Sequence, residues 1–182
     1  MTFATLFLRP LRTLATMALG AGLLAGCAAS GEVAVKCPEI RIPQNTDRMT
    51  RFVPGDGRDI TDVRLKAEIR YLSGTCEVKE ETISMSFPLV VGAQRGPANT
   101  DGVSDVAVFV AVAKPDRTIL NRRELPFKLT FPGNKVRVIA REPLTVDIPK
   151  TAGQGARDFL IFMGFALTRD ELDYNRSEER LR

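Results

Sequence analysis

The sequence predicts an antiparallel β-sandwich followed by one short helix. In about eight segments apolar residues alternate with polar ones, and Pro and Gly clusters separate these segments. No helical period is found before residue 168. Short alternating strands with turn residues between them are typical of a sandwich. A small β-barrel is the alternative, because alternation does not distinguish a closed sheet from two packed sheets.

The predicted strands follow one another along most of the chain. In order they cover residues 33–42, 51–55, 63–71, 75–78, 83–91, 106–112, 119–131, 136–148 and 159–167. The first is interrupted by Pro38 and is expected at a sheet edge, because proline donates no ladder hydrogen bond. Residues 44–50 read as a polar loop. Residues 63–71 alternate most regularly, which predicts a strand that is buried on one face and solvated on the other.

Prolines and turn residues punctuate the later strands. Pro88 marks a bulge or a sheet edge, and Pro143 divides its segment into a strand pair or one bent strand. Residues 114–117, Lys-Pro-Asp-Arg, have the composition of a tight turn. Residues 94–104 are expected to form a loop. Residues 159–167 are almost continuously apolar, as in a fully buried strand.

Thr168 and Glu171 have the spacing of a capping box and predict a short, charged helix after them. The resulting organisation has four parts: residues 1–26, a signal peptide; 27–32, a tether; 33–168, the β-sandwich; and 169–182, the helix and tail. Within the sandwich class, an immunoglobulin- or fibronectin-like type is the first expectation.

An apolar run without charge precedes Cys27. Arg9 and Arg12 are the only charged residues among the first 31. The run is shorter than the about 20 residues that span a bilayer, and it fits the apolar region of a secretory signal. The sequence Leu-Ala-Gly-Cys at residues 24–27 resembles the lipobox of bacterial lipoproteins. An ordinary cleaved signal and an uncleaved anchor are the alternatives, but neither needs a cysteine at this place.

The lipobox resemblance implies that Cys27 carries a covalent lipid and is the first residue of the mature chain. A diacylglyceryl thioether and an acylated α-amino group, with chains such as palmitate, would anchor it, because each buried methylene contributes about 0.8 kcal/mol. The next residue is Ala28 and not Asp. In the proteobacterial sorting pattern this implies export, so we expect the periplasmic face of the outer membrane.

Charge and cysteine content agree with this compartment. Of the 26 Lys and Arg residues only two precede Cys27, so the chain from there keeps 24 against 22 acidic residues, a formal charge of +2. This balance gives no footprint for nucleic acid, so no such partner is expected. Cys37 and Cys76 remain once Cys27 is lipidated, and we expect them to form a disulfide in an oxidising space. Two buried free thiols are the alternative.

The sequence offers little catalytic chemistry. It contains no histidine, which removes the Ser-His and Cys-His relays and the commonest zinc ligand. Asp56, Asp59 and Asp62 lie close together, but their spacing is not that of an EF-hand loop, and a solvated turn is the preferred interpretation. We therefore expect no catalytic residue, no metal ligand and no cofactor other than the lipid on Cys27.

The end of the chain carries a second resemblance. Residues 164–168 (Gly-Phe-x-Leu-Thr) and 172–176 (Leu-x-Tyr-Asn-Arg) resemble the closing stretch of an uncharacterised group of small proteobacterial outer-membrane lipoproteins. Shorter likenesses lie at residues 51–55, 74–76 and 95–96. The resemblance implies no activity. It directs attention to Tyr174, Asn175 and Arg176, which we predict as a contact surface.

The expected function is that of a non-enzymatic module. The lipid on Cys27 would hold it to the membrane, and a sheet face or edge would bind another envelope protein. The alternative is a glycan- or peptidoglycan-binding or carboxylate-based envelope protein. Its site would use Asp56, Asp59 and Asp62 or the pair Arg122 and Arg123.

Overall fold

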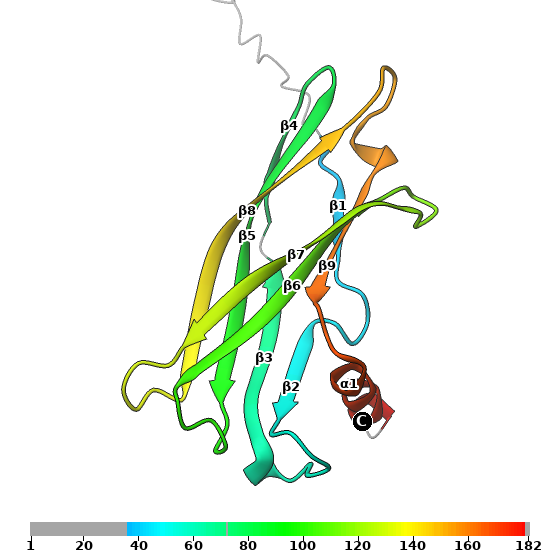
Figure 1. Cartoon of the computed structure of the whole chain (residues 1–182). Coiled ribbons are helices and arrows are strands. Elements are labelled where there is room, and N and C mark those ends of the chain that lie inside the picture. The colour runs from blue at the N-terminus through cyan, green and yellow to red at the C-terminus, as the bar shows by residue number, and fades with distance from the viewer. Residues whose placement is uncertain (1–35, 72, 181–182) are drawn as a thin grey trace, which may run out of the picture. The chain divides into compact units, whose positions relative to one another are not determined.

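The computed structural model describes residues 36–71 and 73–180. The chain divides into two units, residues 1–33 and 34–182, and the second contains every described element. The residues predicted as signal peptide and tether, Cys27 among them, lie outside the described residues. The second unit is a two-layer β structure with one α-helix, and its sheets do not close into a barrel, so the barrel alternative is wrong (Figure 1).

One layer, sheet A, has four strands in the order β1-β9-β6-β7. Their bounds are β1 Glu39–Arg41, β9 Leu160–Phe165, β6 Val103–Ala113 and β7 Ile119–Thr130. β1 pairs parallel with β9, whereas β6 pairs antiparallel with both β7 and β9.

The other layer, sheet B, is built around its longest strand, β5. Its strands are β2 Arg48–Phe52, β3 Val63–Tyr71, β4 Thr75–Val78, β5 Thr82–Arg95 and β8 Arg137–Pro149. β3 and β4 pair with successive parts of β5, and β8 pairs with β5 along almost its whole length. β2 pairs with β3 and forms the far edge.

The core lies between the sheets and follows the predicted alternation. On β3 Val63, Leu65, Ala67 and Ile69 are buried, and on β6 Val106, Val108 and Val110 are buried. β3 and β6 thus each present one apolar face inward, because successive side chains point to opposite faces of a sheet. The chain crosses between layers after β1, β5, β7 and β8, so β8 returns to pair with β5 and β9 returns to pair with β6.

The interior strand β5 contains Pro88, which was expected at a bulge or an edge. The pairing of β5 with β3 ends at Leu89, and its pairing with β4 resumes at Ser86. Opposite Pro88 on the other side stands Pro143 of β8. Pro88 thus lies between the part of β5 that pairs with β3 and the part that pairs with β4. This gap in pairing explains how an interior strand accommodates a proline.

Several element bounds differ from those predicted. β2 begins at Arg48, inside the expected polar loop, because its pairing with β3 and not its polarity determines the strand. β1 covers only Glu39–Arg41. Residues 137–149 form one continuous strand through Pro143. β5 and β6 each extend into the loop expected at residues 94–104.

The α-helix α1, Arg169–Arg180, packs beside edge strand β2 at the end of the sandwich away from the β4–β5 turn (Figure 1). It begins after Thr168, as the capping box predicted: the Glu171 carboxylate accepts from the Thr168 amide at 2.9 Å, and the Glu171 amide donates to Thr168 Oγ1 at 3.2 Å. Short 3-10 helices lie at η1 Ile60–Asp62 and η2 Ala156–Asp158.

Candidate functional site

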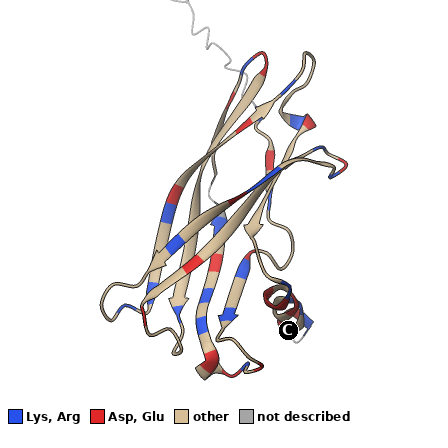
Figure 2. Cartoon of the chain, in the orientation of Figure 1, with Lys and Arg blue, Asp and Glu red and all other residues tan. Residues whose placement is uncertain are grey.

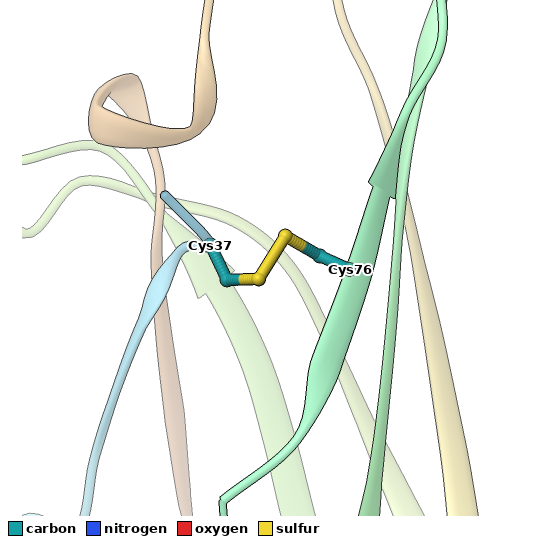
Figure 3. The surroundings of a disulfide bond; sticks show 2 residues. All are labelled: Cys37 and Cys76. Carbon is teal, nitrogen blue, oxygen red and sulfur yellow. A yellow bond between two sulfur atoms is a disulfide. The ribbon is translucent and has the colours of Figure 1, made fainter. Parts of the chain in front are cut away.

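The two cysteines predicted to pair lie at disulfide-bonding distance. Their sulfur atoms are 2.06 Å apart and their Cα atoms 5.5 Å apart (Figure 3). Cys37 immediately precedes the β1 region of sheet A, and Cys76 lies on β4 of sheet B. The bond therefore joins the two layers at the end of the domain where the described chain begins. We call this the disulfide end.

The β6–β7 hairpin belongs to the disulfide end by strand register. Ala113 at the end of β6 pairs with Leu160, and Leu160 pairs with Glu39, two residues after Cys37. The turn is closed by a 2.9 Å bond from the Arg117 amide to the Lys114 carbonyl and a 2.9 Å bond from the Lys114 amide to the Thr118 carbonyl. The predicted tight turn at residues 114–117 thus connects the two strands.

The first half of β7 is exposed on both faces, although its register continues the sheet. Arg123 lies on the face that carries buried residues farther along β7, and its guanidinium donates to the Thr145 carbonyl of β8 at 2.6 Å. Arg122 lies over the Phe109 ring, 5.0 Å from its centroid, and pairs with Glu124 at 2.8 Å. Arg122 and Arg123 therefore both make contacts within this domain, Arg122 with Phe109 and Glu124 and Arg123 with the Thr145 carbonyl.

At the opposite end, polar contacts dock α1 on β2. We call this the helix end. Arg51 of β2 donates through Nε to the buried Glu171 carboxylate at 2.8 Å and through a terminal nitrogen to the Asp105 carbonyl of β6. A single guanidinium thus joins the helix, one strand of sheet B and one strand of sheet A. Capping and ion pairing converge on Glu171.

Asn175 occupies the centre of this contact. Its side chain is only 2% exposed and donates to the carbonyls of Asn45 and Arg48, at 2.9 and 2.7 Å. One turn later the Glu179 carboxylate accepts from the side chains of Asn45 and Gln44, which lowers the pKa of Glu179 below its ordinary value. These bonds fix the loop before β2 to the helix.

The three residues predicted as a contact surface lie in different environments. Asn175 is buried, Arg176 is exposed and pairs with Asp173 at 3.1 Å, and Tyr174 packs edge-on against Phe52 with ring centroids 4.9 Å apart. Burial and the nearby Glu178 raise the pKa of Tyr174. Tyr174 and Phe52 also line a hollow of about 250 Å³ between the helix and β2.

A surface that the sequence analysis missed lies on the outer face of sheet B. Ile60, Val136 and Ile139 are 71%, 54% and 68% exposed. Ile60 and Val136 line a hollow of about 360 Å³ with Lys66 and Gln94. The adjacent apolar pair Val138 and Ile139 was the available signal, because strict alternation would place a polar residue at one of them. We call Ile60, Val136 and Ile139 the outer patch.

Two of the three aspartates between β2 and β3, Asp59 and Asp62, accept hydrogen bonds from the backbone of their own loop. Asp59 accepts from the Thr61 amide at 3.0 Å, which lowers the Asp59 pKa, and the Asp59 amide donates to Asp62 at 3.0 Å. Asp56 is exposed. Within the described residues, no three His, Cys, Asp or Glu side chains are grouped so as to hold a metal ion.

No family model, curated protein or solved structure matches this chain. Among the described residues, no helix has both the length and the apolar character needed to cross a bilayer.

Proposed function

We propose that this protein is a lipid-anchored, non-enzymatic binding module of the bacterial periplasm. Cys27 carries the lipid, and the domain binds another envelope protein through the outer patch. The anchor places it at the periplasmic face of the outer membrane. The lipobox resemblance supports the lipid anchor, and the exposed apolar side chains on sheet B support the binding role.

The position of the outer patch carries this proposal. β5 begins beside β4, which holds Cys76, and ends near Val136, whose carbonyl accepts from the Arg95 amide at 2.8 Å. Ile139 pairs with Gly92, also near the far end of β5. The patch thus lies away from the disulfide end, where the chain enters the domain. Ile60 and Val136 line one hollow, and Ile139 lies on the same outer face opposite Gly92; exposed apolar patches of this kind mark protein interaction sites.

Crosslinking in intact membranes tests the proposal. A photoreactive residue at Ile139 should capture one protein partner, whereas the same residue at Lys128, exposed on the outer face of sheet A, should not. Ile60→Ser with Ile139→Ser should abolish this capture without releasing the protein from the membrane. Equal capture from both positions would count against the patch. A Cys27→Ala protein that keeps full function would count against the anchor.

The glycan-binding alternative remains a separate proposal. Its candidate residues lie on different layers: the aspartates precede β3 of sheet B, and Arg122 and Arg123 lie on β7 of sheet A. The contacts of these groups inside the domain favour the protein-binding proposal. Recovery of glycan alone in the crosslinking experiment would reverse this preference.

Within the β-sandwich class we propose an immunoglobulin- or fibronectin-like type. A disulfide between the two layers supports it, because such a bond is a hallmark of immunoglobulin domains. The absence of tryptophan distinguishes this chain from antibody domains, which have a buried Trp on strand C.

A further inference from the structure

The β6–β7 hairpin exposes two adjacent apolar side chains at the disulfide end. Ile119 and Leu120 are 50% and 48% exposed. The register pairs Ala113 with Ile119 and Val112 with Asn121, so Leu120 is the extra residue of a bulge. Bulges redirect side chains away from the regular sheet surface.

Basic side chains surround this apolar pair. The hairpin contains Lys114, Arg117, Arg122 and Arg123 against Asp116 and Glu124, and Figure 2 shows the blue segments along β7 and at its turn. Arg122 and Arg123 hold groups of the domain, as described above. In the described part of the chain, the guanidinium of Arg117 makes no ion pair.

The backbone of Arg117 takes the left-handed conformation at the end of the hairpin turn. Its φ is +70°, in the left-handed region that favours glycine. The turn itself uses only the amide of this residue, which donates to the Lys114 carbonyl. Three-residue hairpin loops commonly close with one residue in this conformation, so the turn accounts for the backbone of Arg117, and its exposed cationic side chain extends into solvent.

We propose that this hairpin docks on the anionic phospholipid surface to which Cys27 is anchored. Ile119 and Leu120 lie at the level of the headgroups, and Lys114 and Arg117 contact lipid phosphates. Apolar side chains flanked by cations are the composition of interfacial membrane contacts. This inference rests on the lipid anchor of the proposed function.

The length of the tether supports this occupant. Nine residue steps separate Cys27 from Lys36 and reach at most about 30 Å when fully extended. Ala113, where the hairpin starts, lies two strands from Glu39 with Leu160 between them, so an anchored Cys27 keeps the hairpin close to the bilayer. A contact that is weak in free solution becomes significant at the high effective concentration that such a tether gives.

A fluorescent reporter on the lipidated protein tests the docking. Cys27 is blocked by lipid and Cys37 and Cys76 are bonded, so Leu120→Cys provides the single free thiol. Val136→Cys, with 54% exposure away from the disulfide end, is the matched control. Both proteins are reconstituted in phosphatidylcholine vesicles with and without phosphatidylglycerol, and a headgroup-labelled quencher lipid reports proximity. We expect strong, phosphatidylglycerol-dependent quenching at position 120 and little at position 136.

Arg117→Gly separates folding from docking, because glycine fits the turn at least as well as arginine. In the Leu120→Cys background it should reduce the docking equilibrium constant about fivefold, the effect of one cation near an anionic surface. Equal quenching at both positions, or quenching unaffected by phosphatidylglycerol, would overturn the hairpin proposal while leaving the anchor intact. Release of the protein from the vesicles would overturn the anchor and, with it, the docking.

Discussion

The disulfide end and the helix end attach a terminal segment to the same sandwich by different means. At the disulfide end, β1 has only three residues, and a covalent bond holds the segment before it to the opposite sheet. At the helix end, α1 is rich in charged residues, and its buried members include Glu171 and Asn175. The comparison shows that apolar burial is not the only way to dock a segment, because a few buried polar groups with hydrogen-bond partners also hold α1 in place.

Removing the disulfide should give the largest change in the free energy of unfolding among the tests of this comparison. Cys37→Ser with Cys76→Ser opens a closed loop with a sequence separation of 39 residues. In the chain-entropy model this lowers the free energy of unfolding by about 4 kcal/mol. Urea unfolding of the lipidated protein in detergent, with and without reductant, measures the change. An unchanged midpoint would show that the β1–β9 pairing alone secures this end.

The corresponding test at the helix end is Asn175→Ala. It leaves the buried carbonyls of Asn45 and Arg48 without their side-chain donor, which should lower the free energy of unfolding by about 1–3 kcal/mol. Arg176→Ala, in the same turn but exposed, should change it by less than about 0.5 kcal/mol. Thermal or urea unfolding measures both variants. Equal effects would show that docking does not depend on the buried amide.

A double-mutant cycle of Arg51→Gln and Glu171→Gln measures the ion pair between strand and helix. Because Glu171 is buried and Arg51 partly exposed, we expect a coupling energy of about 1 kcal/mol in urea unfolding. Glutamine at 171 keeps the capping geometry, so the cycle isolates the charge. Asp170→Asn, exposed in the same helical turn, is the control. Additive effects of the two changes would rule out a net contribution from the pair.

The smallest expected effect is a pH dependence of helix docking. Bonds from Asn45 and Gln44 lower the pKa of Glu179 below its unfolded value. Its stabilisation is therefore present above the ordinary glutamate pKa and is lost as pH falls through the lower, folded pKa. Amide hydrogen exchange along α1 should increase over that acidic range, and Glu179→Gln should flatten the response. A wild-type profile that matches the variant would contradict this.

Strand periodicity predicted most of the strands, because burial of one face of a strand produces the alternation of apolar and polar residues. The bounds expected for residues 63–71 and 75–78 are those of β3 and β4, and the capping box placed the start of α1 correctly. Pairing between distant segments was not predictable. β2 is polar in sequence and becomes a strand because β3 provides its partner, and the parallel partner of β1 lies near the end of the chain.

The same difference between local and distant contacts decides which candidate sites could be predicted. The cysteine pair was predictable from the number of cysteines and the expected oxidising compartment, whereas the outer patch is assembled from η1, the β7–β8 loop and β8. The glycine at position 74 in one of the resembling segments has a packing reason. A side chain there would collide with the Ser86 carbonyl of β5, so only glycine lets β4 approach.

The bond from Arg123 to the Thr145 carbonyl has a consequence for how neighbouring copies behave. It joins β7, an edge of sheet A, to β8, an edge of sheet B, and an inward-facing charge on an edge hinders the addition of a foreign strand. This single guanidinium thus hinders edge-to-edge association between copies of the domain.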